Sequence, residues 1–312
     1  MTKLKYITIS VILLLLLSVA RPSLNVSAGP LAVTSPGLGA ADSFAVLSGA
    51  LTSNVPGSSI TGNVGVDPIG GASITGLTCA EVTGTIYDND GGYTGNGGGS
   101  TACRVTDAGL LTSAKNDLVT AYDGLAALDN ATCTSIPSEL GGQSLVAGVY
   151  CAGTFTLTGI LNLQGAGVWI FRSADTIITA PGSSVTGGNP CNVWWRSESS
   201  VTLDSTTSFI GNILALTSIT MNTGASLTGR ALARNGAVTL QQNTISRPIC
   251  TAPTTVTEVL EEETTVTVRA LPNTGGAPIR NDSFPWTLAI FGGVGAAALI
   301  LGLRTYLRAN KQ

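Results

Sequence analysis

The sequence predicts a mainly β fold, a three-sided (triangular) β-helix solenoid with one long α-helix packed along one face. Three observations favour this class. Self-similar units of about 17–24 residues recur between residues 40 and 250, and such internal periodicity is typical of stacked repeats. Each later unit holds three short runs of alternating side chains separated by turns, which predicts three strands per unit. The segment 106–128 has apolar residues at helical spacing.

The third strand of each unit alternates apolar residues with serine and threonine. Because successive side chains of a strand point to opposite faces, one apolar column should face the core: Ile60, Ile74, Val185, Phe209, Leu227 and Ile245. Its neighbours should then point to solvent, with Ile210 as the apolar exception: Ser59, Thr61, Ser73, Thr75, Ser184, Thr186, Ser208, Ser226, Thr228, Thr244 and Ser246. The second strand adds another outward column, interrupted by Ile178: Thr156, Thr202, Thr220 and Thr239. We therefore expect two exposed hydroxyl faces.

The first strand of each unit is apolar on both sides, so something must cover it. Its inward column is expected to be Val149, Val168, Val193, Ile213 and Ala231, and its outward column Tyr150, Trp169, Trp194, Leu214 and Leu232. The helix 106–128 can supply the cover through an apolar stripe of Leu111, Ala114, Leu118, Ala121, Tyr122, Leu125 and Leu128. Residues 77–105 are expected to form a cap or loop over one end of the solenoid.

The composition argues against an enzyme. The chain of 312 residues has no histidine, so it lacks the usual general base and the commonest metal ligand. Only 11% of its residues are charged and its formal charge is -3, so there is no basic stripe of the kind that indicates nucleic-acid binding. Asp88-Asn89-Asp90-Gly91 resembles a calcium loop but lacks its glutamate, and an ordinary turn is the alternative. The carboxylates Asp175, Glu198 and Asp204 do not obviously converge as a glycosidase pair. We expect no catalytic residue, cofactor or metal.

A second alternative concerns the aromatic residues of the first strand. Tyr150, Trp169 and Trp194 could form a platform on which sugars stack. Because they align opposite the apolar helix stripe, burial beneath the helix is the favoured interpretation.

The N-terminal end of the chain resembles a processing signal. Residues 1–28 hold two lysines, then an apolar run, then small residues, which is the order of a secretory signal peptide. Cleavage after Ala28 is favoured over cleavage after Ala20, and a retained membrane anchor is the alternative. Residues 29–39 then form an N-terminal segment before the domain of residues 40–250.

The C-terminal end carries a second signal. A Thr/Glu-rich spacer (251–270) precedes Leu271-Pro272-Asn273-Thr274-Gly275, an apolar segment long enough for a transmembrane helix (286–303) and a basic tail (304–312). This order resembles the LPxTG cell-wall sorting signal of Gram-positive surface proteins. The resemblance implies that a sortase cuts after Thr274 and joins the secreted chain to peptidoglycan. In a host without sortase, the helix would remain as a membrane anchor.

Six cysteines in an exported chain point to disulfides. Several connectivities are open, and we expect consecutive pairing, Cys79–Cys103, Cys133–Cys151 and Cys191–Cys250. A zinc site is the rival interpretation, but the sequence has neither histidine nor a C-x-x-C spacing.

The hydroxyl columns contain almost no charge, unlike most solvated faces. Strands of stacked units lie about 4.7–4.9 Å apart, so a flat Ser/Thr face would present hydroxyls and methyls on a rigid lattice. Such a lattice can order water into an ice-like layer. Exposed Ser/Thr strands of a merely stiff rod are the alternative.

Several segments resemble the microbial β-solenoid ice-binding (antifreeze) family: L-G-A-A-D-S-F-A-V-L-S-G (38–49), S-I-T-G-N-V-G-V-D-P (59–68), G-V-W-I-F (167–171), C-N-V-W-W (191–195) and the stretch 211–240. The resemblance covers residues 40–250. It implies a discontinuous triangular β-helix with a helix alongside and an ice-binding surface on one flat face, often marked T-[A/G]-x-[T/N]. Thr223-Gly224-Ala225-Ser226 approximates this motif, whereas Ser205–Ser208 and Thr179–Gly182 match it less well.

We therefore expect the third-strand face, with Thr223, to bind ice and the second-strand face to be the reserve. The expected partners are ice or ordered water, sortase with peptidoglycan, and the membrane before processing, for a monomeric chain. A cell-surface adhesin or structural module that binds glycans or other cells is the alternative, and a polysaccharide lyase comes third.

Overall fold

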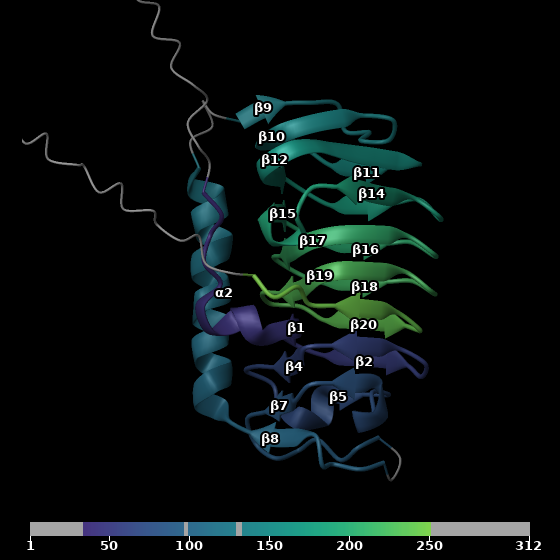
Figure 1. Cartoon of the computed structure of the whole chain (residues 1–312). Coiled ribbons are helices and arrows are strands. Elements are labelled where there is room, and N and C mark those ends of the chain that lie inside the picture. Colours follow the sequence, from purple (N-terminus) through teal and green to yellow (C-terminus); the bar gives the residue numbers. More distant parts are fainter. Residues whose placement is uncertain (1–33, 97–98, 129–132, 251–312) are drawn as a thin grey trace, which may run out of the picture. The chain divides into compact units, whose positions relative to one another are not determined.

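The computed structural model describes residues 34–96, 99–128 and 133–250, which lie in the first of two compact units, Met1–Thr254. The expected signal peptide (1–28), spacer, LPNTG motif (271–275), transmembrane segment (286–303) and basic tail lie outside these residues. Among the described residues, no helix is long and apolar enough to cross a membrane. The described part is mainly β with one long helix, as predicted (Figure 1).

The second strands of the units form a seven-stranded sheet in which every pairing is parallel. Its order is β11 (Phe155–Leu157), β13 (Ile177–Thr179), β16 (Val201–Leu203), β18 (Ile219–Met221), β20 (Val238–Gln241), β2 (Thr52–Val55) and β5 (Ile74–Thr75). In most of these strands the central side chain points outward between two buried ones.

The first and third strands form a parallel sheet of 14 strands. Its main path is β8 (Arg104–Thr106), β7 (Ile86–Asp88), β4 (Asn63–Val66), β1 (Phe44–Ser48), β19 (Ser226–Ala233), β17 (Ser208–Ala215), β14 (Ser184–Gly187), β12 (Ile160–Ser173), β10 (Ser144–Ala152) and β9 (Cys133–Ser135). Beside this path pair β15 (Val193–Ser197), β21 (Thr244–Ser246), β3 (Ser59–Thr61) and β6 (Val82–Thr83). Strands β17 and β19 each run on from a third-strand position into the next first strand.

The stacking order differs from the chain order. The last three strands, β19, β20 and β21, pair with the first three, β1, β2 and β3. On their other side β19 pairs with β17 and β20 with β18. The C-terminal unit therefore lies inside the stack, between strands from the N-terminal unit and strands from the preceding unit.

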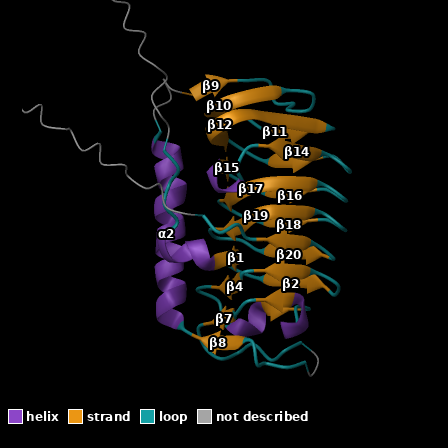
Figure 2. Ribbon diagram, in the orientation of Figure 1, coloured by secondary structure: helices purple, strands orange, loops and turns teal. Residues whose placement is uncertain are grey.

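The long helix, α2 (Ala108–Ala127), lies along the first strands (Figure 2). The Asp107 carboxylate caps its N-terminus by accepting a hydrogen bond from the Leu110 amide, 2.9 Å away. Its predicted apolar stripe packs against Phe44, Leu47, Ile170, Trp194, Leu214 and Leu232. The predicted helix and its covering role are confirmed, with ends that differ by one or two residues from the expected 106–128.

The first-strand pattern is right for the later units and wrong for two earlier ones. Val193, Ile213 and Ala231 face the inner core, whereas Trp194, Leu214 and Leu232 face the helix, as expected. Tyr150 and Trp169, however, point inward, and Val149 faces the helix. The register explains this difference, because Trp169, not Val168, pairs with Val193 and β10 carries an irregularity between Val146 and Gly148. A one-residue slip turns every side chain to the opposite face.

The segment 77–105 is more than the expected cap. It contains the 3-10 helix Cys79–Glu81 and the strands β6, β7 and the start of β8, all of which extend the large sheet: β6 pairs with β3, β7 with β4, and β8 with β7. Further 3-10 helices cover Gly39–Ser43, Gly71–Ser73 and Pro190–Asn192. Tyr93 in this segment is buried and donates a hydrogen bond to the Leu77 carbonyl.

Three disulfides join the cysteines in the expected consecutive order. They are Cys79–Cys103, Cys133–Cys151 and Cys191–Cys250, with Cα–Cα distances of 5.5, 5.9 and 5.6 Å. The first lies near β8 and the second joins β9 to β10, so each fastens one end of the large sheet. The third joins residues 59 positions apart and fastens the point where the described chain ends.

Candidate functional site

The third-strand face is a grid of hydroxyl groups two columns wide. The first column follows the register Ser184, Ser208, Ser226, Thr244 and Ser59. The second follows Ile210, Thr228, Ser246, Thr61 and Thr83. The apolar residues between the columns, Phe209, Leu227, Ile245 and Ile60, are buried. Parallel register therefore fixes the spacing along each column at the interval between strands, about 4.7–4.9 Å.

Most hydroxyls of this grid are free to meet water. Among the described residues, Ser59, Thr61, Thr228, Thr244 and Ser246 are exposed and their hydroxyls have no protein partner. Ser226 and Thr186 donate long hydrogen bonds of 3.4 and 3.3 Å to the carbonyls of Thr207 and Leu161. Neither column contains a charged residue. The face can thus offer an ordered set of hydroxyl and methyl groups to a solid or ordered ligand.

The structure corrects the membership of this face. Ser73 and Thr75, expected here, lie elsewhere, because Thr75 belongs to β5 and pairs with Ser53 of the seven-stranded sheet, while Ser73 ends a 3-10 helix. Thr83 of β6 takes a place in the second column that sequence reasoning missed. Its signal was the run Glu81-Val82-Thr83-Gly84, which ends like the other third strands.

The second-strand face is one column wide. Its outward residues follow the register Thr156, Ile178, Thr202, Thr220, Thr239, Ser53 and Thr75. Thr156, Thr202, Thr220 and Thr239 are only half-exposed, and Ile178 is an exposed apolar residue among them. This face therefore presents fewer accessible hydroxyls than the third-strand face.

A carboxylate stands at one end of the second-strand column. Glu139 accepts hydrogen bonds from the Thr156 hydroxyl (3.0 Å) and from the Thr158 amide (2.8 Å). Burial raises the pKa of Glu139, but the hydrogen bonds from Thr158, Gly141 and Thr156 outweigh this effect and hold the pKa below its ordinary value. The charge is thus present near neutral pH. The expectation of an uncharged surface does not hold at this end of the reserve face.

Thr223 lies in the corner between the two faces, not in a column. It occupies the turn between β18 and β19, where its hydroxyl donates to Gln241 (3.2 Å) and Gly224 takes a positive φ of 74°. Ala225 is buried and Ser226 begins the next strand. The motif 223–226 therefore joins a corner to the third-strand face. Since Ser184, Ser208 and Ser226 are register partners, its counterparts are 181–184 and 205–208. The expected match at Thr179–Gly182 is shifted by two residues.

The corner turn gives a stability prediction. Thr206 stands where neighbouring turns have Gly182 and Gly224, and it adopts a φ of 58°, which is unfavourable for a β-branched residue. We expect Thr206→Gly to raise the free energy of unfolding by about 0.5–1 kcal/mol, the relief of strain being partly offset by the entropy of glycine in the unfolded chain. Urea unfolding measures the change. Gly224→Ala, in the equivalent turn, should destabilise the domain, and a loss of stability in Thr206→Gly would contradict the argument.

The other candidate sites are not assembled. Tyr150, Trp169 and Trp194 are buried, with 7%, 0% and 3% of their surface exposed, so they offer no platform for sugars. Glu198 forms an ion pair with Arg196, whereas Asp204 accepts hydrogen bonds from Asn222 and Ser205, which lower its pKa. Each of these carboxylates is thus held by its own neighbours.

The acidic loop at residues 88–91 is also satisfied from within. Asp88 accepts hydrogen bonds from the amides of Gly91 and Tyr93, and Asp90 accepts from those of Gly71 and Gly92. The described residues contain no cluster of three or more side chains suited to a metal ion. The turn interpretation therefore accounts for these two aspartates.

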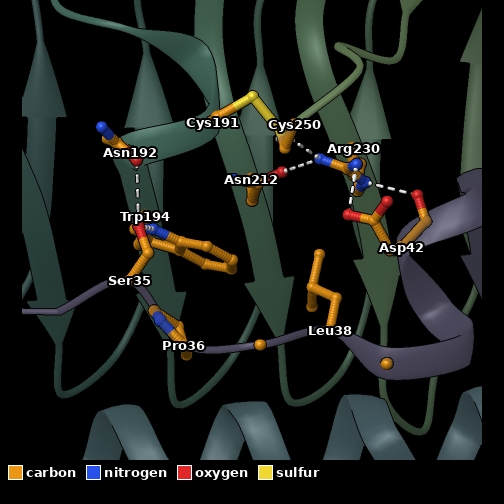
Figure 3. Close-up of a pocket in the computed structure, with 12 residues that line it drawn as sticks. Ser35, Pro36, Leu38, Asp42, Cys191, Asn192, Trp194, Asn212, Arg230 and Cys250 are labelled. Atoms are coloured by element: carbon orange, nitrogen blue, oxygen red, sulfur yellow. Dashed lines mark hydrogen bonds and ion pairs between the residues drawn. A yellow bond between two sulfur atoms is a disulfide. The ribbon is translucent and has the colours of Figure 1, made fainter. Parts of the chain in front are cut away.

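A cavity of about 340 Å³ lies between the N-terminal segment and the first strands (Figure 3). Its lining includes Leu38, Trp194, the Cys191–Cys250 disulfide and the fully buried Arg230. Burial lowers the pKa of Arg230 to about 10, partly offset by the nearby Asp42, so the guanidinium is charged at neutral pH. Each of its nitrogens already donates to a protein acceptor. This cavity therefore presents no unpaired cation to a ligand.

The comparisons with known proteins identify the family of this domain. A family model described as ice-binding-like matches residues 46–246. The chain belongs to this family. Ice-binding proteins of Flavobacterium frigoris (strain PS1) and Nostoc sp. (strain HG1) are 39% and 38% identical to it, covering 68% and 74% of this chain and 76% and 81% of their own lengths.

Two solved structures extend the similarity to the fold. A domain of Shewanella frigidimarina ice-binding protein 1 aligns with a TM-score of 0.62 and 28% identity, over 70% of this chain and 100% of that one. An ice-binding protein from an Arctic yeast aligns with a TM-score of 0.60 and 30% identity, over 70% and 96%. These descriptions name ice-binding proteins, and none names an enzyme. In this chain, the two hydroxyl faces are the candidate surfaces for contact with ice.

Proposed function

We propose that the domain binds ice, without catalysis, through the third-strand face. The observation that supports this proposal is the grid of register-paired hydroxyls, two columns wide and without charge. A surface whose groups repeat at a fixed interval can hold water molecules at matching intervals, so that an ordered layer joins the protein to the ice lattice. Family membership and the ice-binding relatives point in the same direction.

The third-strand face is the better candidate of the two because of width and exposure. Binding to a crystal plane requires contacts in two directions, and only the third-strand face repeats hydroxyls both along and across its strands. The second-strand face has a single half-exposed column, an exposed Ile178 and the Glu139 carboxylate at one end. A charge holds its own hydration water in an arrangement that differs from ice.

We further infer that the chain winds as a discontinuous, three-sided β-helix. Parallel pairing between successive units and the insertion of the C-terminal unit beside the N-terminal one support this architecture. Repeated winding gives each face a constant strand spacing. Flatness follows, because every unit places the same kind of side chain at the same position.

We propose that the domain acts outside the cell, attached to the wall. The signal-like residues 1–28 and the L-P-N-T-G sequence (271–275) with the apolar segment 286–303 and its basic tail support export and sortase attachment. Three disulfides fit an oxidising compartment. On this proposal the protein holds cells to ice or limits recrystallisation near the surface, and it remains membrane-anchored where sortase is missing.

Inhibition of ice recrystallisation by the fragment 29–250 tests the function. We expect the wild-type fragment to be active and Thr228→Tyr to lose most of that activity, because a bulky ring within the second column breaks the flat surface. Thr220→Tyr, on the second-strand face, is the matched control and should remain active. Circular dichroism should show that both variants fold.

The opposite outcomes are equally clear. Loss of activity in Thr220→Tyr with full activity in Thr228→Tyr would assign ice binding to the second-strand face. An inactive wild-type fragment would contradict ice binding altogether. If that inactive fragment bound polysaccharides, the adhesin alternative would replace the ice-binding proposal.

A further inference from the structure

The described part of the chain ends at Cys250, which a disulfide holds to the rest of the domain. After β21, a strand of three residues, the chain runs through Pro248 and Ile249 to Cys250. Cys250 is bonded to Cys191, which belongs to the 3-10 helix just before β15. Strand β15 in turn pairs on both sides, with β12 and β17. The last residue of the domain is thus covalently joined to the middle of the large sheet.

Arg230 forms a second set of contacts with the chain just before Cys250 (Figure 3). Its guanidinium donates to the Pro248 carbonyl (3.3 Å), to the Asn212 side chain (2.7 Å) and to the Asp42 carboxylate (2.6 Å). These groups come from the exit segment, from β17 and from the N-terminal 3-10 helix. Because Arg230 is fully buried and lies on β19, one side chain connects the chain exit to three other elements.

The exit also lies away from both hydroxyl faces. Cys250 lines the same cavity as Leu38 and Trp194, which pack against α2. That side of the domain is covered by the helix and the N-terminal segment. A tether attached at Cys250 therefore leaves the third-strand face free to meet a large solid ligand.

We propose that the Cys191–Cys250 disulfide and the Arg230 contacts carry mechanical tension between the domain and its C-terminal anchor. This proposal rests on the proposed attachment of the chain to the cell wall through residues 251–312. When the bound ligand pulls on the third-strand face, the tension reaches Cys250 and passes to Cys191, Asn212 and Asp42. Without the disulfide and the Arg230 contacts the tension would first peel off β21 and then β20, which are held only by short ladders.

Single-molecule pulling of the whole chain in detergent tests the proposal. One handle holds Gln312, and the other joins an azide-bearing amino acid that replaces Thr186 on β14, which mimics a load on the third-strand face. With the disulfide intact, residues between Cys191 and Cys250 carry no tension. In the variant Cys191→Ser/Cys250→Ser we expect unfolding at lower force, with an added extension of about 200 Å from the freed residues.

The pair Cys79→Ser/Cys103→Ser is the matched control, because it removes a disulfide that lies outside this path. Its unfolding force should equal that of the wild type, even where its melting temperature falls. Arg230→Lys, added to Cys191→Ser/Cys250→Ser, should lower the unfolding force further, because without the disulfide the tension reaches Pro248, whose carbonyl accepts a hydrogen bond from Arg230. Any variant that does not fold is revealed beforehand by its circular dichroism.

Two results would overturn the proposal. Equal losses of force in both cysteine pairs would mean that Cys191–Cys250 is a general stabilising cross-link. An unchanged force in Cys191→Ser/Cys250→Ser would mean that the strands alone carry the load. Because no ice is involved, this experiment is independent of recrystallisation inhibition, so a failure of ice binding and a failure of this proposal are distinguishable.

Discussion

Replacing Trp195 by alanine is expected to lower the free energy of unfolding by about 3–5 kcal/mol. Trp195 is completely buried, and its ring stacks on Phe171 with centroids 4.0 Å apart and an angle of 10° between the planes. Its ring centroid also lies 4.7 Å from that of Phe209, and its indole donates a hydrogen bond to the Ile210 carbonyl. The substitution leaves a cavity, breaks the stack and removes the donor from a backbone acceptor.

Equilibrium unfolding in urea measures this loss, provided that the disulfides remain oxidised. Ile178→Ala is the control, since Ile178 is an apolar side chain with 44% of its surface exposed and should cost little. If Trp195→Ala cost no more than the control, the aromatic stack would not be supporting the core. The prediction also bears on the face, because Phe209 lies directly behind Ser208 and Ile210.

The stack belongs to an inner column that changes in size along the domain. Register partners run Tyr150, Phe171, Trp195, Ile213, Ala231, Val46, Val64 and Ile86. Three aromatic residues therefore follow one another at one end, and aliphatic residues fill the same column further on. Substitution by alanine is therefore expected to lower the free energy of unfolding most at the aromatic end of this column.

The sequence was sufficient to predict those features that depend on a local period. Third strands such as 226–229 alternate strictly, so Leu227 had to face the core and Ser226 and Thr228 the solvent, as the structure confirms. The stripe of α2 was equally readable. In both cases one side of the element is buried, and the buried side fixes the register.

Features that depend on residues distant in the sequence could not be predicted from a local period. The segments 59–62 and 73–76 have the same four residues, S-I-T-G, yet β3 pairs with β21 while β5 pairs with β2. The same four-residue sequence thus lies in two different sheets, because the intervening chain decides which strand each copy pairs with. The irregularity in β10 had the same consequence for Tyr150, whose direction follows from its pairing with Phe171.

Buried charges were missed for a related reason. Nothing near Arg230 in the sequence indicates that Asp42, Asn212 and Pro248 will surround it. Lys115 lies on α2 between stripe residues, and the sequence suggests an exposed side chain. Its partners are carbonyl groups more than a hundred residues away, at Ala233 and Arg234.

Lys115 leads to a prediction about pH. The side chain is buried and its ammonium donates hydrogen bonds to the Ala233 and Arg234 carbonyls. Burial lowers the pKa of Lys115 from 10.5 to about 8; Asp67 opposes this shift and Arg234 adds to it. Between these two values the unfolded chain holds a proton that the folded chain has released. Unfolding then takes up a proton, so the contribution of Lys115 to stability rises with pH across this window.

We expect the difference in unfolding free energy between wild type and Lys115→Met to shift by about 3 kcal/mol in favour of the wild type between pH 7 and pH 10.5. Urea unfolding of both proteins at several pH values measures this difference. Tyr122, whose pKa is raised by burial, titrates in both proteins and cancels from the comparison. A difference that stays constant with pH would show that the ammonium keeps its ordinary pKa. In that case the contact between α2 and the strand that ends at Ala233 would be looser than the hydrogen bonds of Lys115 indicate.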